Sequence, residues 1–105
     1  MNVLIIRFEL AGIDRDAYVT LTEQLAPAVA RMPGLLQKAW LADEANGVYG
    51  GAYLFADHDS VEAYLGSEMV QGIRNSGMFK HVSIEVFDTL EPATSITLAR
   101  ELALA

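Results

Sequence analysis

The chain has 105 residues, of which 52% are hydrophobic, and its 14 acidic and 7 basic residues give a formal net charge of −7. This length suffices for one domain with one core, and the apolar content exceeds that of an average soluble domain. The acidic balance argues against nucleic-acid and anionic-membrane partners, which need a basic face, and the absence of cysteine excludes disulfides, thiolate catalysis and Cys-ligated metals.

The apolar excess predicts a second buried surface in addition to the core. A chain of this size has little interior, so we expect the surplus to line a subunit interface or a ligand cavity. The apolar run at residues 3–6 is too short for a signal peptide or a membrane span, and no basic segment precedes it. We therefore expect a cytoplasmic protein.

The first third of the chain predicts a strand, a helix and a second strand. Residues 2–10 are rich in β-branched side chains, as strands are. Asp14 can cap a helix whose apolar residues recur at helical spacing, with Pro27 inside the pattern. The Pro-Gly pair at 33–34 ends this helix, and residues 35–42 predict the second strand.

A hairpin follows. Residues 43–47 carry turn-forming side chains, with the Asn-Gly pair at 46–47 as the expected tip. Residues 49–55 predict the third strand. The adjacent glycines at 50–51 indicate either a bulge or a place where another group approaches the backbone closely.

The next segment predicts a divided helix. Asp57 and Asp59 compete as its N-cap, and Asp59 has capping-box spacing with Glu62. The Gly-Ser pair at 66–67 separates this helix from a second helical piece at 68–75.

The C-terminal part predicts a fourth strand and a tail. Residues 80–90 alternate between apolar and polar side chains, and a Glu-Pro pair follows at 91–92. The tail over residues 91–105 is apolar with few charges. The sequence allows two conformations of this tail: a short helix, or a segment packed on a partner subunit.

The element order βαββαβ predicts one α+β domain over residues 1–105, with a ferredoxin-like antiparallel sheet covered by helices on one face. We assign the wholly apolar strand positions to the covered face: Leu4, Ile6, Phe8, Ala39, Leu41, Ala52, Leu54, Val82, Ile84 and Val86. The remaining positions form the expected open face: Val3, Ile5, Arg7, Glu9, Leu36, Lys38, Trp40, Tyr53, Phe55, His81, Ser83, Glu85 and Phe87.

The expected open face mixes large aromatic side chains with a few charges. A solvated face would not carry so many aromatics, and an ordinary core would not carry Arg, Lys and Glu. Two copies packed face to face would bury the aromatics and enclose a cavity with a few polar groups, as in small-molecule pockets. The sequence therefore predicts a homodimer that encloses a pocket.

Four segments carry a resemblance to a known family. They are PGLLQKAW at 33–40, GGAYLF at 50–55, AYL at 63–65, and VFD at 86–88 followed by EP at 91–92. With them the chain resembles the YdhR-like monooxygenases, in the dimeric α/β-barrel superfamily that includes the antibiotic-biosynthesis monooxygenases. The resemblance extends over nearly the whole chain.

The resemblance implies a homodimer whose two sheets close a barrel, with a pocket in each subunit. It implies an oxygenase that acts with molecular oxygen on an aromatic or polyketide-like substrate, without flavin, haem or metal. In that chemistry the deprotonated substrate activates oxygen itself, and the protein binds, deprotonates and orients it. Related barrels catalyse isomerisation, decarboxylation, cyclisation or haem degradation, so a different reaction and a non-catalytic binding module both remain alternatives.

Three residues are the candidate catalytic groups. His81 is a general-base candidate by residue type, with a surface histidine as the alternative. Tyr53 can donate a hydrogen bond to a phenolate or enolate oxygen, or be an ordinary buried tyrosine. Arg7 can stabilise an oxyanion, or form a salt bridge within the dimer.

Six further residues are expected to contact the substrate: Trp40, Lys38, Phe55, Tyr64, Glu85 and Phe87. Trp40 matches the family's tryptophan and can stack on a ligand or anchor the interface. Lys38 can stabilise an oxyanion or form a salt bridge. Tyr64 is expected near the pocket mouth, where the glycine-containing segment at 66–77 resembles a lid. His58, between two aspartates at a helix start, does not predict a metal site because adjacent residues at a cap point in different directions.

Overall fold

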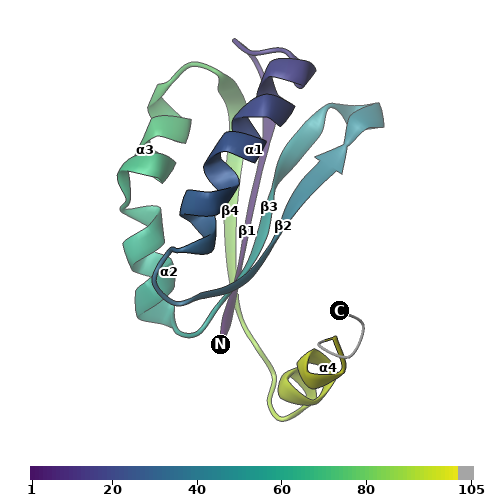
Figure 1. The fold of residues 1–105 in the computed structure, drawn as a ribbon, viewed down its shortest axis with the longest axis vertical. Coiled ribbons are helices and arrows are strands. Elements are labelled where there is room, and N and C mark those ends of the chain that lie inside the picture. Colours follow the sequence, from purple (N-terminus) through teal and green to yellow (C-terminus); the bar gives the residue numbers. More distant parts are fainter. Residues whose placement is uncertain (102–105) are drawn as a thin grey trace.

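The computed structural model describes residues 1–101 and, besides a one-turn 3₁₀ helix at Glu44–Asn46, contains four strands and four α-helices in the described part. In chain order they are β1 (Asn2–Leu10), α1 (Arg15–Ala30), β2 (Leu35–Asp43), β3 (Val48–Phe55), α2 (His58–Leu65), α3 (Glu68–Asn75), β4 (Phe79–Asp88) and α4 (Ala93–Glu101). The strands form one antiparallel sheet in the order β2-β3-β1-β4 (Figure 1). The ferredoxin-like α+β fold expected from the sequence is confirmed.

Helices α1, α2 and α3, which cover the sheet, each have a side-chain cap at their N-terminus. Asp14 accepts a hydrogen bond from the Ala17 amide at 2.8 Å, and α1 continues through Pro27. Asp57 accepts from the Ser60 amide at 2.8 Å, so the capping box expected from Asp59 does not form. Each carboxylate satisfies an amide that has no partner within the helix, which explains why the helices begin where they do.

The Gly50 backbone lies close to strand β1. Its φ is +153°, and a Cβ atom there would lie 1.9 Å from the Ile6 carbonyl oxygen. The register shifts of the sheet occur elsewhere, between Arg7 and Glu9 and between Leu35 and Gln37. Of the two interpretations of the glycine pair, close backbone approach is confirmed at Gly50.

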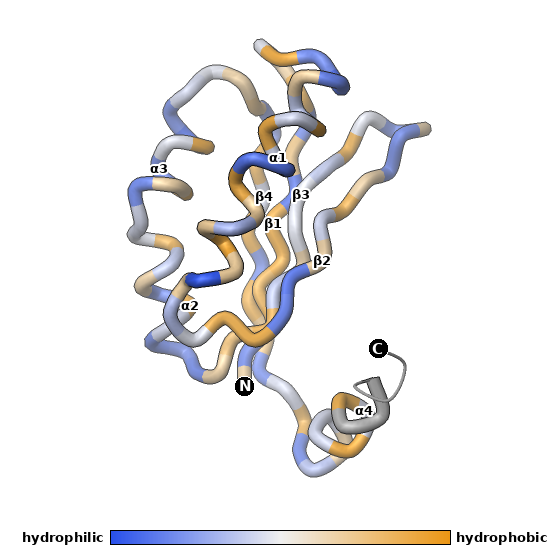
Figure 2. Tube along the Cα trace, viewed as in Figure 1, coloured by the Kyte–Doolittle hydropathy of each residue, from blue (hydrophilic) through white to orange (hydrophobic). Residues whose placement is uncertain are grey.

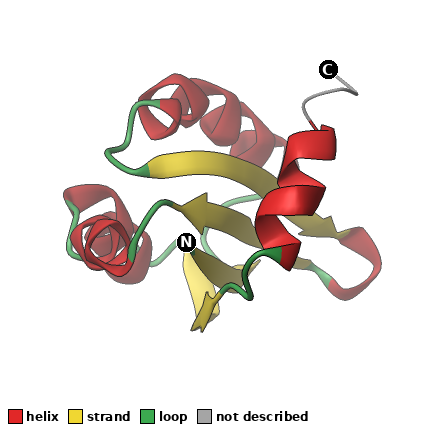
Figure 3. Cartoon of the chain, turned by 90° about the horizontal axis from the view of Figure 1, so that it is seen from below, coloured by secondary structure: helices red, strands yellow, loops and turns green. Residues whose placement is uncertain are grey.

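The core lies between the sheet and helices α1, α2 and α3, which share one face of the sheet (Figures 1 and 3). Figure 2 shows hydrophobic residues concentrated along the central strand β1. The core cluster consists of Leu4, Ile6, Phe8, Tyr18, Tyr49, Tyr53, Phe55, Val61, Tyr64 and Val70. It therefore includes several side chains that we expected on the open face.

The expected faces are correct for β1 and wrong for β2 and β3. Tyr53 pairs with Leu4 on one side and with Lys38 on the other, and Trp40 pairs with Gly51. Directly paired residues point to the same side of a sheet, so Lys38, Tyr53 and Trp40 lie under the helices. Phe55 lies there too. The smaller residues Ala39, Leu41, Ala52 and Leu54 occupy the open face instead.

The C-terminal tail forms a short helix. Helix α4 follows β4 after a short connection and stands apart from the other helices (Figure 1). Its Thr94 and Leu98 border a groove whose other wall includes the open-face residues Val3, Ala52 and Leu54. The last residues of the tail, 102–105, lie outside the described residues. Within the described part of the chain, no helix is long and apolar enough to cross a membrane.

Candidate functional site

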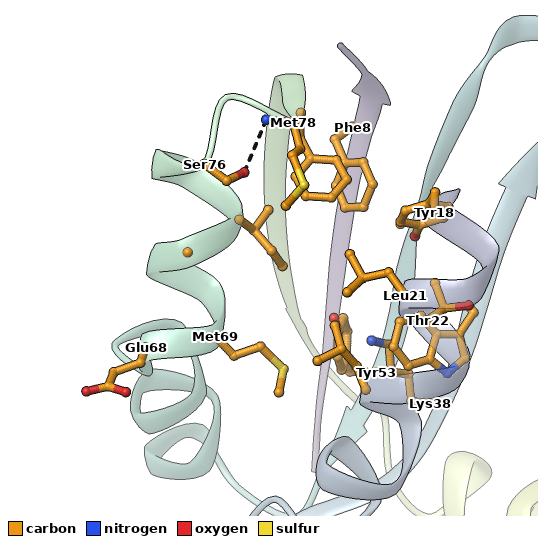
Figure 4. Close-up of a pocket in the computed structure, with 16 residues that line it drawn as sticks. Phe8, Tyr18, Leu21, Thr22, Lys38, Tyr53, Glu68, Met69, Ser76 and Met78 are labelled. Atoms are coloured by element: carbon orange, nitrogen blue, oxygen red, sulfur yellow. Dashed lines mark hydrogen bonds between the residues drawn. The ribbon is translucent and has the colours of Figure 1, made fainter. Parts of the chain in front are cut away.

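A cavity of about 320 Å³ lies between the sheet and helices α1 and α3 (Figure 4). We call it the Lys38 cavity. Its volume is within the usual range for small-molecule sites. The apolar part of its wall consists of Phe8, Leu21, Leu25, Met69, Ile73, Met78 and Phe79. Met69 extends from α3 toward Tyr53 in Figure 4.

Several polar residues of the wall already have partners or point elsewhere. The Thr22 hydroxyl donates to the Val19 carbonyl at 2.7 Å, and the Ser76 hydroxyl oxygen accepts from the Met78 amide at 3.2 Å. The Glu68 carboxylate points away from the cavity (Figure 4). The side chains of Lys38, Tyr53, Tyr18 and Trp40 therefore provide the polar atoms available to a ligand.

Among the residues that the structure describes, Lys38 is the only cationic one in the cavity wall. Its Nζ lies 3.3 Å from the centroid of the Trp40 ring and 4.4 Å from that of the Tyr53 ring. In the part of the chain that the structure describes, no carboxylate lies within ion-pair distance of this amine. Burial lowers the pKa of Lys38 from 10.5 to about 7 because the charged form loses water without gaining a counter-ion. A large fraction of the amine is therefore uncharged near neutral pH.

Tyr53 connects the cavity to helix α2. Its hydroxyl shares a hydrogen bond with the Tyr64 hydroxyl, with 2.9 Å between the oxygens. Burial raises the pKa of both phenols, and it raises the pKa of Tyr18 to about 12. All three tyrosines stay protonated at physiological pH, and each can donate a hydrogen bond.

Gly51 provides the space that Lys38 and Tyr53 occupy. A Cβ atom at this position would lie 2.8 Å from Lys38 Cε and 2.8 Å from Tyr53 Cε1. Such distances are too short for carbon atoms, so any larger residue would displace one of these side chains. The second glycine of the pair therefore shapes the cavity, whereas Gly50 accommodates strand β1.

The open face carries two charged pairs. Arg7 forms an ion pair with Glu85, and His81 Nδ1 lies 2.7 Å from Glu9 Oε2. His81 has a φ of +54° where the β1–β4 register shifts. These pairs stand among apolar residues of the open face, on the opposite side of the sheet from the Lys38 cavity.

The family model described as "Putative mono-oxygenase ydhR" matches residues 3–100 of the chain. The chain belongs to the ydhR family. This confirms the resemblance carried by its four sequence segments. None of the curated proteins compared with the chain shows a significant match.

Solved structures share the fold of this ydhR-family chain. A putative antibiotic biosynthesis monooxygenase from Deinococcus radiodurans superposes with a TM-score of 0.72 and 14% identity, covering 87% of this chain and 94% of that chain. A second one from Caulobacter crescentus CB15 has a TM-score of 0.69 and 20% identity, with 86% and 90% covered. SnoaB, a cofactor-independent oxygenase from Streptomyces nogalater, has a TM-score of 0.65 and 16% identity, with 86% and 93% covered.

The structure brings together three of the nine expected site residues of this ydhR-family chain. Trp40, Lys38 and Tyr53 line the Lys38 cavity. Phe55 and Tyr64 lie behind Tyr53, with ring centroids 6.0 Å and 5.0 Å from it. The four strand residues among them, Lys38, Trp40, Tyr53 and Phe55, were expected on the open face, and the strand pairing corrects this to the helix-covered side.

The other four expected site residues lie on the open face and outside the cavity. They are Arg7, His81, Glu85 and Phe87. Their face was predicted correctly, but the Lys38 cavity lies on the other side of the sheet. The physical reason is that the helices bury Tyr53 to 3% exposure without a second subunit, whereas Trp40, on the edge strand β2, stays 37% exposed on the same side.

Sequence reasoning placed the segment at 66–77 near the pocket mouth but named none of the α3 side chains that line the cavity. Met69, Gly72 and Ile73 line the cavity. Their spacing of three and four residues places them on one side of a helix. This spacing could have predicted that α3 turns this side toward the sheet. Tyr18 and Leu21 showed the same periodicity in α1, which predicted burial but could not distinguish a core from a cavity.

Metal-ligating side chains do not gather in the described residues. No group of three or more His, Asp or Glu side chains is placed there to hold an ion. His58 pairs with Glu62 on α2 at 3.3 Å, one helical turn apart. The polar groups of the cavity are an amine and phenols, which suit an organic ligand better than a cation.

Proposed function

We propose that this protein is a cofactor-independent monooxygenase that acts on a small, mostly apolar, aromatic substrate in the Lys38 cavity. The observation that carries the proposal is the Lys38 amine, which faces Trp40 and Tyr53 in an apolar cavity and has no carboxylate partner among the described side chains. Membership of the ydhR family and the fold shared with known oxygenases support the reaction class.

Lys38 has the properties of a general base that then becomes a counter-ion. As a free amine near neutral pH it can accept a proton from an acidic hydroxyl or activated methylene group of the substrate. The resulting ammonium pairs with the substrate anion in surroundings that strengthen their attraction. The Tyr53 hydroxyl, held by Tyr64, can donate a hydrogen bond to the same anion.

The deprotonated substrate supplies the electrons for the reaction with oxygen. An activated methylene group and one O₂ molecule give a carbonyl group and one water molecule. One oxygen atom stays on the substrate, the other leaves as water, and no external reductant is needed. The apolar wall contributes by excluding bulk water from the reacting carbanion.

Oxygen uptake with a panel of anthrones, phenols and quinols tests this proposal. We expect uptake for at least one activated compound, retention of uptake after treatment with a chelator, and its loss in Lys38→Met. Lys80→Met is the matched control, because Lys80 is the other lysine of the chain and is exposed on β4. Trp40 is the only tryptophan and reports binding through its fluorescence.

The outcomes separate two functions. Saturable quenching of Trp40 without oxygen uptake for any compound would favour a non-catalytic binding protein. Uptake that is equal in Lys38→Met and in the parent protein would contradict the role of Lys38. Absence of both binding and uptake would overturn the proposed site.

We further propose that the protein is a homodimer formed through the open sheet face. This face carries the apolar side chains of Val3, Ile5, Ala52 and Leu54, and Phe87 is 48% exposed there. Exposed apolar residues also continue onto the C-terminal segment, at Leu90 and Ile96. Two such faces packed together would remove this surface from water.

A further inference from the structure

We propose that Lys38 is a covalent binding site for apolar aldehydes and ketones, with its amine condensing with the carbonyl group of a ligand in the Lys38 cavity to form an imine. This activity needs no oxygen and does not depend on the monooxygenase proposal. It rests on where the amine lies and on what surrounds it.

The first argument is that the amine is presented to the cavity without a competing partner. Across the described residues, no hydrogen bond or ion pair holds Lys38 Nζ, and its neighbours are the Trp40 and Tyr53 rings. Gly51 has no side chain to press on Lys38 Cε, where a Cβ atom would lie only 2.8 Å away. Lys38 lines the cavity, so a ligand there can reach its amine.

The second argument concerns the protonation state. Only a free amine attacks a carbonyl carbon, and lysines gain this reactivity when burial in an apolar pocket makes their charged form unfavourable. The same loss of hydration brings the pKa of Lys38 to about 7. An ordinary exposed lysine has a pKa near 10.4, so only about one in 2,500 of such amines is free at pH 7.

The third argument is that one of the rings facing the amine is a phenol, with the Tyr53 ring centroid 4.4 Å from Lys38 Nζ. The nitrogen lone pair forms the new C–N bond while the carbonyl oxygen takes up a proton and becomes a hydroxyl group. That hydroxyl leaves as water as the C=N bond forms, so one imine and one water arise from one amine and one carbonyl, with no redox change. The neutral Tyr53 hydroxyl, which Tyr64 positions, can supply and recover the proton.

The cavity wall defines the class of carbonyl compound. A cavity of roughly 150 Å³ is enough to hold benzene. The Lys38 cavity, at about 320 Å³, is about twice as large and is lined mainly by aromatic and aliphatic side chains. We therefore expect aldehydes with two fused rings or an equivalent aliphatic chain to react, and strongly charged aldehydes such as glyoxylate to react poorly.

Reductive trapping tests the proposal on the unmodified protein. The protein is incubated with 2-naphthaldehyde and cyanoborohydride at neutral pH, digested, and mapped by mass spectrometry. We expect Lys38 to gain the mass of the aldehyde less one oxygen atom, and to be labelled at least about tenfold faster than Lys80, since far more of its amine is free. Glyoxylate should show no such preference.

Two controls keep the outcome decisive. Lys38→Met keeps an unbranched side chain of similar length but has no amine, so it should lose the adduct while its circular dichroism stays unchanged. Excess 2-naphthol should slow labelling of Lys38 and leave that of Lys80 unchanged. Equal labelling of the two lysines, or labelling of Lys38 that 2-naphthol does not slow, would overturn the proposal, whatever the result of the oxygen-uptake experiment.

Discussion

The hydroxyl groups of Tyr53 and Tyr64 share a hydrogen bond between the sheet and helix α2, with 2.9 Å between their oxygens. Each side chain is 3% exposed, so neither hydroxyl has ready access to bulk water. Tyr53 also lies in the cavity wall, which makes the pair a link between the candidate site and the core. Each tyrosine satisfies the polar group of the other at a place where an unpaired hydroxyl would be costly.

Removing one hydroxyl of this pair should destabilise the protein. We expect Tyr64→Phe to lower the free energy of unfolding by about 1–3 kcal/mol, because it leaves the Tyr53 hydroxyl buried without its partner. Tyr53→Phe should have a similar effect. The double variant should lose less than the sum of the two, as urea unfolding in a double-mutant cycle would measure. Strictly additive losses would show that the two hydroxyls are not coupled.

Two glycines should respond in opposite ways to alanine. Gly50→Ala would bring a methyl group against the Ile6 carbonyl oxygen and strain a φ of +153°, so we expect a loss of at least about 2 kcal/mol. Gly72 lies within helix α3 with no heavy atom within 4 Å of its Cβ position. Gly72→Ala should therefore raise stability by about 0.5–1 kcal/mol. Thermal unfolding of both variants measures the contrast, and a stable Gly50→Ala protein would contradict the close approach of β1.

Gly51→Ala should act mainly on ligand binding. The atoms nearest to the added methyl group would be Lys38 Cε and Tyr53 Cε1, which are side-chain rather than backbone atoms, and the flexible lysine can yield, so the fold should survive. Their displacement narrows the cavity, and we expect affinity for two-ring phenols to fall at least about tenfold, equivalent to about 1.4 kcal/mol. Fluorescence titration of Trp40 measures the affinity. An unchanged affinity would show that ligands bind away from β3.

The helices, strands and turns were largely predictable from sequence. Which residues of each strand point toward the helices was not. Caps and turn residues such as Asp14 and Gly47 act within a few residues, so they predicted element boundaries. In β3, Ala52 and Leu54 on one side and Tyr53 and Phe55 on the other are all apolar or aromatic, so alternation alone cannot say which side meets the helices.

Lys38 shows why its face of strand β2 was assigned to the wrong side of the sheet. A lysine is rarely buried without a partner, which favoured an exposed position for its whole strand face. The structure instead places its amine against aromatic rings, where loss of hydration makes the uncharged form accessible. The position of the amine against these rings depends on how side chains of β2 and β3 pack in three dimensions. The spacing of residues in the sequence does not reveal it.

The same amine should give the protein a distinctive dependence of stability on pH. The pKa of Lys38 is about 7 in the folded protein and close to its ordinary 10.5 in the unfolded chain. Between these values the unfolded state binds more protons, so stability should rise with pH across this window. Above about pH 10 the trend should reverse, because the raised pKa values of Tyr18 and Tyr53 mean that the unfolded chain releases those protons first.

Urea unfolding across this pH range measures the Lys38 contribution. The midpoint should rise from neutral pH toward about pH 9 in the parent protein and in Lys80→Met, and this rise should be largely absent in Lys38→Met. Comparing the two lysine variants separates the buried amine from the general effect of the net charge of −7. Identical profiles for all three proteins would show that Lys38 is as well hydrated in the folded state as in the unfolded chain.

An aspartate at the centre of the open face should abolish the proposed dimer. Ala52 pairs with Ile5 on one side and with Ala39 on the other, so it lies in the middle of the apolar surface. In a dimer its replacement by aspartate would bury two unpaired like charges, which costs several kcal/mol, whereas a monomer keeps the carboxylate in water. Ala63→Asp on the exposed side of α2 is the matched control, with the same change of charge.

Sedimentation should find a dimer for the parent protein and Ala63→Asp, and a species near 11.4 kDa for Ala52→Asp. A parent protein that sediments near 11.4 kDa would contradict the dimer, and its open face would then be exposed to water.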